Sequence, residues 1–444
     1  MSSIIPQEVD DIVSKLEGAD YKAYLVGGCI RDFLLHKPIK DFDITTEATP
    51  EQIKEVFPEA ITAGNTFLVS LVNGIEVATF RKDFDDHAER SLTLKEDVLR
   101  RDFTINALAG NIRLFKNNRN YEVIDYVGGV KDLENRVLRF VGEPQRRIEE
   151  DPVRILRGIR FASKYNLEIE KHTYRAMCAN KDLIESIPKE RIVTEIKKAF
   201  DSKCGYRFVR LLQELDMLKF IFPCLYDLTG IGGGGYHNET VLDHCLFALK
   251  AVEDMNIPFK LKLACLYHDV GKCQPIVNDK GFNTFRHHDE IGPNYALQDL
   301  KYHLKMPNDI VEYVVVMCRH HMHCIDTARS VRKLMVKLEA NNIPLKDFII
   351  IRYADNNGNL KSNYTFKDAR KAYRQCLEFL KDKPTPFSVK SLEINGKDVM
   401  RLLNIQQGKQ IGIILNSLFN KVVDGELDNK RDVLESEVLK WNVK

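Results

Sequence analysis

Residues 24–46 read YLVGGCIRDFLLHKPIKDFDITT, and this stretch decides the fold of the first part of the chain. Its pattern of apolar and turn-forming residues predicts a strand, a Gly-Gly turn, a helix from about Cys29, and a second strand that carries Asp41 and Asp43. Because alternate side chains of a strand point to the same face, the two carboxylates are presented together. Two adjacent oxygen anions are costly without a cation, and Mg²⁺ suits such a site.

The glycine turn adds a second feature to this stretch. Gly27 and Gly28 let the backbone approach a ligand closely, and the helix start behind them favours an anion. Arg31 adds a fixed positive fork for phosphate. A Gly-Gly turn or a DxD pair alone is common, but GGxxRD followed closely by KDFD is much more specific. A phosphate cradle beside paired carboxylates is what nucleotidyl transfer needs.

Composition limits the class of protein. The chain has 444 residues, of which 44% are hydrophobic and 29% charged, as in a soluble globular protein of several domains. A net charge of +2 neither implies nor excludes a nucleic-acid partner. The 10 cysteines form no CxxC pair, which indicates reduced thiols and a cytoplasmic protein. The acidic N-terminal segment is neither a signal nor a transit peptide, and no apolar run is long enough to span a membrane.

A hairpin is predicted after the second strand. Residues 67–72 and 75–80 flank Asn73-Gly74, a strong turn pair. Glu76 lies in this hairpin, where it either completes a carboxylate triad or is an ordinary exposed strand residue, and the pattern alone favours the second interpretation. Residues 82–99 are polar and without a clear period, so we expect a mobile loop.

Two later segments mix charged and apolar residues. RRDFTINA at residues 100–107 places polar groups in an apolar context, where they must pair with a ligand or with each other. EEDPVRILRGIRFASKY at residues 149–165 predicts a helix that begins near Pro152. Its arginines recur every three residues and therefore lie near one another on the helix surface. They form either a solvated face or a row that contacts phosphates or base edges.

A series of motifs spans about residues 20–200: LVGGCIRD, KDFDI, EVATFR, KEDVLRRDFTINAL, DYVGGVKDL, EDPVRILRGIRFA and KERIVTEIKKAF. The first two resemble the nucleotidyltransferase superfamily of DNA polymerase beta. Together the motifs resemble the bacterial-type (class II) tRNA nucleotidyltransferases, the CCA-adding enzymes, and their close relatives the bacterial poly(A) polymerases. The resemblance implies template-independent addition of C, C and A to the 3′ end of tRNA from CTP and ATP, with Mg²⁺ in the site.

The resemblance also implies roles for single residues. The catalytic acids would be Asp41, Asp43 and Glu76, with Asp41 and Asp43 as Mg²⁺ ligands. The nucleotide-binding residues would be Gly27, Gly28, Arg31, Arg101, Asp102, Asn106, Asp151, Arg154, Arg157 and Arg160. Among these, Asp151 and Arg154 would act as an amino-acid template, because a carboxylate accepts from the amine that C and A share and meets a carbonyl in U and G.

One departure from the family leaves alternatives open. The family's flexible loop, linked to the switch from C to A addition, corresponds to residues 81–100 and looks shorter here than in many members. An enzyme restricted to C or A addition, or a poly(A) polymerase, remains an alternative. An RNA-binding protein with inactive sites is an alternative from another class.

A second constellation follows the glycine run at residues 231–235, which predicts a flexible joint. Spaced His and Asp residues on successive expected helices resemble the HD metal-dependent phosphohydrolase domain, which some CCA-adding enzymes carry. The resemblance implies four ligands for a divalent transition metal: His244, His268, Asp269 and Asp355. His288 and His320 would add a second metal or position phosphate. The other interpretation is a degenerate domain kept for packing or RNA binding.

We therefore expect an α+β protein. A polymerase-beta-like nucleotidyltransferase head with a mixed sheet would cover residues 1–140, and a helical neck that selects nucleotides and binds RNA would cover residues 141–228. All-α parts would follow, with an HD phosphohydrolase-like domain at residues 229–365 and an RNA-binding tail at residues 366–444. The expected partners are tRNA, CTP and ATP, with no obligate protein partner and no membrane.

Overall fold

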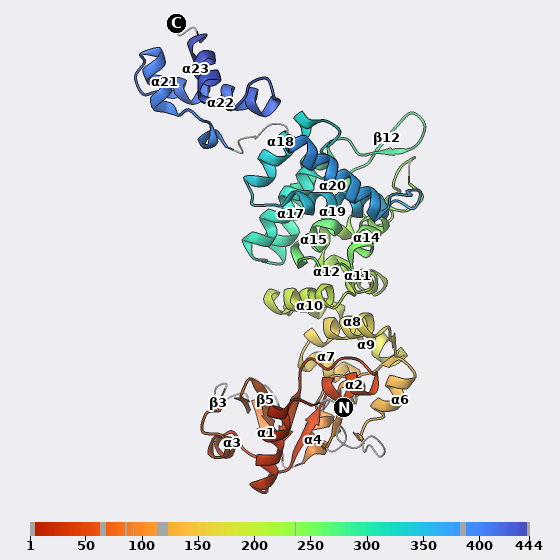
Figure 1. Cartoon of the computed structure of the whole chain (residues 1–444). Helices are drawn as coiled ribbons and strands as arrows, with labels where there is room; N and C mark the ends of the chain where they lie inside the picture. The colour runs from red at the N-terminus through yellow and green to blue at the C-terminus, as the bar shows by residue number, and fades with distance from the viewer. Residues whose placement is uncertain are drawn as a thin grey trace. The chain divides into compact units, whose positions relative to one another are not determined.

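The structure is a computed structural model of the chain and describes residues 5–62, 68–84, 87–91, 93–112, 123–235, 237–381 and 388–441 (Figure 1). The chain forms two compact units. The first comprises Met1–Glu195 and Glu214–Asp216, and the second comprises Ile196–Gln213 and Met217–Lys444. In the described residues, no helix combines the length and the apolar character that a membrane span requires.

A seven-stranded mixed sheet forms the centre of the first unit. In spatial order its strands are β3 (Ile61–Thr62), β4 (Val69–Val72), β5 (Ile75–Thr79), β2 (Asp43–Thr46), β1 (Ala23–Val26), β8 (Leu108–Gly110) and β9 (Val123–Asp125). β2 and β5 are parallel, and the other neighbours are antiparallel. This mixed sheet and the mainly helical remainder confirm the predicted α+β class.

Alternation along the strands creates two cores, one on each face of the sheet. In β1, Leu25 joins a large cluster with α1 (Gln7–Gly18), α2 (Gly28–Leu34) and α3 (Pro50–Val56). The next residue, Val26, joins a smaller cluster on the other face with residues of α4 (Leu94–Leu99). The sheet is thus covered by helices on both faces.

The remaining elements of the first unit are short strands and helices. They are β6 (Arg81–Phe84), β7 (His87–Arg90), η1 (Thr104–Asn106), α6 (Gly129–Glu134), β10 (Val137–Leu138), α7 (Pro144–Glu150), α8 (Val153–Tyr165), β11 (Glu168–Ile169), α9 (Lys171–Ala179), η2 (Lys181–Ser186) and α10 (Lys189–Asp201), whose last residues pass into the second unit.

The second unit consists of helices and one small hairpin. Its elements up to the hairpin are α11 (Gly205–Glu214), α12 (Leu218–Ile221), α13 (Pro223–Tyr226), α14 (Val241–Val252), α15 (Phe259–Tyr267), η3 (Val270–Cys273), β12 (Ile276–Val277) and β13 (Asn283–Thr284). The elements after it are α16 (His288–Leu297), η4 (Gln298–His303), α17 (Asn308–His320), α18 (Ala328–Glu339), α19 (Leu345–Gly358), α20 (Phe366–Lys381), η5 (Val389–Ser391), α21 (Gly396–Leu403), α22 (Lys409–Asp424) and α23 (Arg431–Leu439).

Three local predictions were wrong. β2 begins only at Asp43, because its partner β1 ends opposite that residue at Val26 and leaves Asp41 without a strand to pair with. Most of the described residues between 82 and 99 belong to the antiparallel pair β6–β7 and to helix α4, and not to an irregular loop. The glycine run at residues 231–235 lies inside the second unit, where Gly232 pairs with Thr240, so it does not separate the units.

Candidate functional sites

The predicted catalytic acids lie close together at the N-terminal ends of β2 and β5. The parallel register pairs Ile44 with Val77, and both side chains enter the core with α1 to α3. The residues one position earlier, Asp43 and Glu76, therefore lie side by side and point to the opposite face. Asp41 precedes the strand and is exposed. Glu76 is also exposed, but its register favours the triad over an unrelated strand residue.

The pKa of Asp43 reflects the same cluster of charged side chains. Burial raises the pKa of Asp43, the Glu76 and Asp41 carboxylates raise it further, and Arg101 and Arg31 lower it without reversing the shift. The two neighbouring carboxylates thus oppose the ionisation of Asp43. Negatively charged oxygen atoms that lie this close repel one another unless a cation binds between them. A hard divalent ion such as Mg²⁺ suits such a cluster.

The glycine turn lies against two arginines. Gly27 has a φ of 77°, which favours glycine, and a Cβ there would lie 3.1 Å from Nη1 of Arg101. Arg31 is 5% exposed and donates from Nη1 to Asn106 Oδ1 at 2.5 Å. Its guanidinium carbon lies 4.3 Å from the ring centroid of Tyr165. The Arg31 side chain is therefore fixed beside the turn before any ligand binds.

Sequence reasoning missed Asp97 of α4, which orients the neighbouring arginines. Its fully buried carboxylate accepts from Nε and Nη2 of Arg100 at 3.1 and 2.9 Å, and from Nη2 of Arg101 at 3.3 Å. Burial alone would raise the pKa of Asp97, but the two arginines lower it overall. Arg101 keeps a buried Nε without a hydrogen bond, so it retains donor capacity in the site. An Asp with Arg at positions i+3 and i+4 in KEDVLRR was the available signal.

Asp102, Asn106 and Arg157 form one network. Asp102 accepts from Arg157 Nε and Nη2 at 2.9 and 2.6 Å and from Asn106 Nδ2 at 3.1 Å. Burial opposes ionisation of Asp102, but the Arg157 guanidinium and these hydrogen bonds lower its pKa overall. Through Asn106 the network also reaches Arg31. The structure therefore joins four of the predicted nucleotide-binding residues in one chain of contacts.

The predicted template residues lie at the junction of α7 and α8. Asp151 accepts from Nη1 and Nη2 of Arg191 at 3.0 and 2.8 Å. Arg154 donates from Nη1 to Glu150 Oε2 at 2.6 Å. Arg191, from the KERIV motif, was not among the predicted site residues. Each template side chain is thus held by an oppositely charged neighbour, which fixes the direction of its polar edge.

The arginine row of α8 does not share one environment. Arg157 contacts Asp102, whereas Arg160 is 7% exposed and donates from Nε to Glu195 Oε2 at 2.5 Å. A solvated face is therefore wrong for Arg160. Its contacts indicate that it braces α8 against α10.

The four predicted ligands of the second site come together in the second unit. Nε2 of His244 and of His268 lie 3.1 Å apart. Both nitrogens lie 3.4 Å from Asp269 Oδ2, and they lie 3.2 and 3.5 Å from Asp355 Oδ1. Burial lowers the pKa of His268, but the two carboxylates raise it to about 10 overall. Two His nitrogens and two carboxylate oxygens around one point fit a divalent transition metal.

A second group of ligands shares Asp269. Its Oδ1 lies 3.2 Å from His288 Nε2 and 3.3 Å from His321 Nε2, and it has no hydrogen bond although it is buried. Asp269 therefore directs one oxygen to each group. The structure brings His321 here, and not the predicted His320, because adjacent residues at the end of α17 point in different directions.

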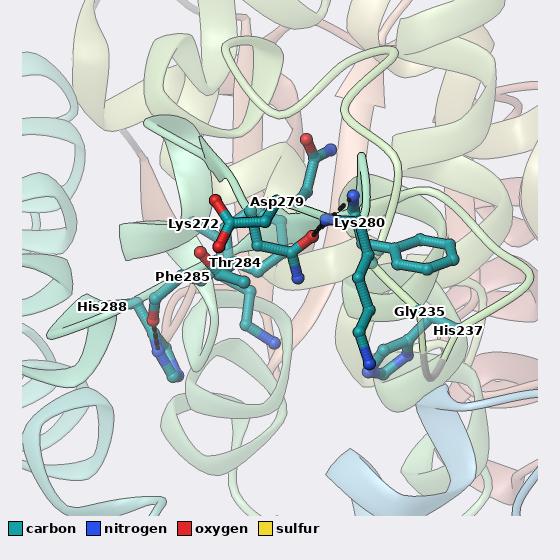
Figure 2. Close-up of a pocket in the computed structure, with 13 residues that line it drawn as sticks. Gly235, His237, Lys272, Asp279, Lys280, Thr284, Phe285 and His288 are labelled. Carbon is teal, nitrogen blue, oxygen red and sulfur yellow. Dashed lines mark hydrogen bonds between the residues drawn. The ribbon is translucent and has the colours of Figure 1, made fainter.

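A cavity of about 660 Å³ adjoins the second site and includes His288 in its wall (Figure 2). Lys272, which sequence reasoning missed, also lines it and places Nζ 2.5 Å from Asp269 Oδ2. The glycine run forms part of the opposite wall. It is closely packed there, since a Cβ at Gly234 would lie 2.7 Å from the Asn283 carbonyl oxygen. The predicted joint is thus a close-packed wall of a pocket.

Known families match three parts of the chain. The family described as the Poly A polymerase head domain matches residues 23–139, and the probable RNA and SrmB-binding site of polymerase A matches residues 166–228. The family described as tRNA nucleotidyltransferase domain 2 matches residues 296–438. The CCA-adding enzyme of Ligilactobacillus salivarius is 28% identical over 95% of this chain and 93% of its own length.

The chain is therefore similar over most of its length to a CCA-adding enzyme, and about half of it is similar to a bacterial poly(A) polymerase. Two further relatives share more identity over a shorter region. The CCA-adding enzyme of Staphylococcus epidermidis is 37% identical over 50% of this chain and 56% of its own length. Poly(A) polymerase I of Escherichia coli O157:H7 is 37% identical over 48% of this chain and 49% of its own length. The chain thus matches about half the length of these two relatives.

Solved structures of two CCA-adding enzymes share the fold of this chain. The Bacillus stearothermophilus CCA-adding enzyme in complex with CTP aligns with a TM-score of 0.73 and 24% identity over 98% of this chain and 96% of its own. The Thermotoga maritima CCA-adding enzyme complexed with tRNA aligns with a TM-score of 0.57 and 20% identity over 99% of this chain and 96% of its own.

Proposed function

We propose that this chain adds C, C and A to the 3′ end of tRNA, using CTP and ATP. The observation that carries the proposal is the cluster of Asp41, Asp43 and Glu76 beside the Gly27–Gly28 turn, with arginines on its rim. The near full-length similarity to the Ligilactobacillus salivarius CCA-adding enzyme supports it. The fold shared with enzymes solved with CTP and with tRNA is consistent with these substrates.

The side chains divide the reaction into binding, orientation and selection. Mg²⁺ held by Asp41 and Asp43 would activate the attacking 3′-hydroxyl and stabilise the leaving pyrophosphate. Arg31 and the glycine turn would bind the triphosphate, and Arg101, oriented by Asp97, would contact the same nucleotide.

Selection of the base would fall to Asp151 and Arg154. The Asp151 carboxylate accepts from the amine of C or A, and the Arg154 guanidinium donates to a ring nitrogen or carbonyl. In the structure Arg191 and Glu150 hold these two groups, so a bound base would compete for, or share, contacts that already fix their orientation.

A-only or poly(A) addition is the second candidate for the same site. The poly(A) polymerase I relatives favour it, because one of them matches about half of the chain at the same 37% identity as the staphylococcal enzyme does. The experiment that separates the candidates supplies tRNA lacking CCA with each nucleotide alone and with CTP plus ATP, followed by sequencing of the new ends. CCA addition predicts two C residues with CTP alone and a single A after them. Long A tracts on tRNA lacking CCA would overturn it.

We also propose that the second site is a metal-dependent phosphohydrolase. The ligands around Asp269 would hold the metal, which when bound would activate water for attack on a phosphate ester. Lys272 lies between the ligands and the cavity and would offer its ammonium group to a phosphate there. A degenerate domain would have no reason to retain every ligand in contact distance. The test is hydrolysis of p-nitrophenyl phosphate and of bis-p-nitrophenyl phosphate with Mn²⁺, Co²⁺ or Ni²⁺, and no turnover of either would favour the degenerate domain.

We place the protein in the cytoplasm. All 10 cysteines are free, and 7 of them are buried, as expected for a chain that folds with reduced thiols.

A further inference from the structure

The four imidazoles around Asp269 are not oriented in the same way. Nδ1 of His268 lies 2.8 Å from the Cys265 carbonyl oxygen, and Nδ1 of His321 lies 2.7 Å from that of Cys318. His288 makes the equivalent contact with Phe285 at 2.8 Å. In each case the backbone carbonyl three residues earlier accepts a hydrogen bond from Nδ1–H, which leaves Nε2 free to bind the proposed metal.

His244 is the exception. It is 2% exposed, and its Nδ1 has no hydrogen bond. The position in the helix explains the difference. His268 and His321 follow the last turns of α15 and α17, where helix carbonyls have no partner within the helix. His244 is the fourth residue of α14, where the Thr240 carbonyl begins the helix hydrogen bonds by accepting from the His244 N–H at 2.9 Å, and the Val241 carbonyl, three residues before His244, lies within the helix.

Glu239 is the acceptor that lies next to this nitrogen. Its side chain is 1% exposed, and Oε1 lies 3.7 Å from His244 Nδ1 and 2.5 Å from His237 Nδ1. Its Oε2 accepts from the backbone N–H of Asn238 at 3.2 Å and of Leu360 at 3.3 Å. Leu360 follows α19, the helix that carries Asp355. Glu239 is therefore buried, hydrogen-bonded on its far side, and directed at the one ring without a partner.

The side chains of His237, Glu239 and His244 could instead hold a metal of their own, since their donor atoms also lie close together. That would require one His244 ring to bind an ion through each nitrogen. Its Nε2 already faces Asp355 and Asp269, at 3.2 and 3.4 Å, so the outer position suits an orienting carboxylate better than a further ion.

We propose that Glu239 is a positioning residue of the proposed metal centre, which accepts the Nδ1–H of His244 and holds its Nε2 toward the metal. A small shift of the ring on metal binding would close the 3.7 Å gap to hydrogen-bond distance. His237 acts one step further out, since it holds the same oxygen of Glu239. The inference rests on the proposed metal site, but it concerns residues outside the ligand set.

The test measures metal binding rather than hydrolysis. Apo protein with Asp41→Ala and Asp43→Ala, so that the transferase acids take up no metal, is titrated with Co²⁺ by calorimetry and by its visible spectrum. Glu239→Gln keeps an oxygen for the two backbone N–H groups but loses the negative charge, and Glu239→Ala loses both. The control is Glu290→Ala, because the Glu290 side chain is 68% exposed and its partner His287 is 70% exposed.

We expect Glu239→Gln and Glu239→Ala to weaken Co²⁺ binding by about 10- to 100-fold, and to change the spectrum of the bound ion, with the control unchanged. A purely structural role predicts a lower Tm of the metal-free protein with unaltered Co²⁺ affinity, and that result would overturn the inference. Co²⁺ affinity within twofold of the parent for both variants would also overturn it. If the parent itself binds no Co²⁺, the proposed metal site fails, which is a different outcome.

Discussion

At the scale of residues, most charged side chains of the proposed transferase site are already paired with one another in the protein. Asp97 holds Arg101, Asp102 holds Arg157, and Arg191 holds Asp151. Asp43 differs from these residues, because two further carboxylates, those of Asp41 and Glu76, lie near it. The unbalanced negative charge is therefore concentrated where the metal is proposed to bind.

Asp41→Ala or Asp43→Ala should abolish nucleotide addition and leave tRNA binding nearly intact, because we propose that these carboxylates hold metal and not RNA. The measurements are single-turnover addition of CTP and the Kd for tRNA, with Glu55→Ala as a control, since Glu55 is an exposed residue of α3 outside the cluster. Turnover above a few per cent of wild type in both Asp variants would contradict the metal assignment.

Asp151→Ala or Arg154→Ala should relax the selection of CTP over UTP. Loss of a charge-assisted hydrogen bond costs about 1.5–3 kcal/mol, or roughly 10- to 150-fold in the ratio of kcat/KM for the two nucleotides. Arg191→Ala should shift the ratio in the same direction but less, because it removes only the partner of Asp151. Arg175→Ala is the matched control, since Arg175 is an exposed residue of α9. An unchanged ratio in both template variants would move selection elsewhere.

The pH dependence of stability should report the pair of Asp102 and Arg157. The folded state lowers the pKa of Asp102, so this group stabilises the fold above about pH 4, its ordinary pKa, and that contribution is lost as the pH falls through the lower folded value. Asp102→Asn should therefore lower the free energy of unfolding by about 1.5 kcal/mol at pH 7. The difference from wild type should shrink in thermal unfolding at pH 3. A constant difference at both pH values would contradict this, and Asp182→Asn, at an exposed Asp, is the control.

At the scale of elements, local signals predicted what local chemistry determines. The Asn73-Gly74 hairpin formed because both residues adopt positive φ, at 50° and 82°, and Thr49 caps α3 in a capping box with Gln52. The start of β2 and the pocket role of the glycine run were not predictable, since each depends on a partner distant in the sequence. Among single residues, His321 and Glu239 were missed because only the fold shows which ring faces the proposed metal position and which side chain lies behind that ring.

The contact between α14 and α19 tolerates no side chain at Gly358. A Cβ there would lie 2.7 Å from the His244 carbonyl oxygen and 2.9 Å from its Nδ1. Gly358→Ala should therefore force the two helices apart, lower the free energy of unfolding by about 1–3 kcal/mol and weaken Co²⁺ binding. Gly412→Ala in α22 is the matched control, because nothing lies within 4 Å of its added Cβ, so it should be neutral or stabilise by up to about 1 kcal/mol. Equal Tm values for the two variants would contradict the packing argument.

At the scale of the whole molecule, the two proposed activities belong to different compact units. Asp41, Asp43 and Glu76 lie in the first unit, and His268 and Asp269 lie in the second. The α+β class and the order of the motifs were predictable from sequence because each motif is continuous in the chain. The division into units was not, because it falls within α10 and α11 and no change in composition marks it.

This division predicts separable activities. His268→Asn with Asp269→Asn should abolish metal-dependent hydrolysis of p-nitrophenyl esters while CCA addition stays within about twofold of wild type. The two substitutions remove a ligand nitrogen and the shared carboxylate, while Asp269→Asn keeps the volume of that side chain and His268→Asn leaves a smaller polar one. The proposed transferase acids belong to the other unit. Both activities are measured on one preparation of each protein, and the Tm of the metal-free proteins shows whether the second unit remains folded. The reciprocal variant, Asp43→Ala, should lose addition and keep hydrolysis. Parallel loss of both activities in a variant with an unchanged Tm would mean that the units act together, and the separate assignment would then fail.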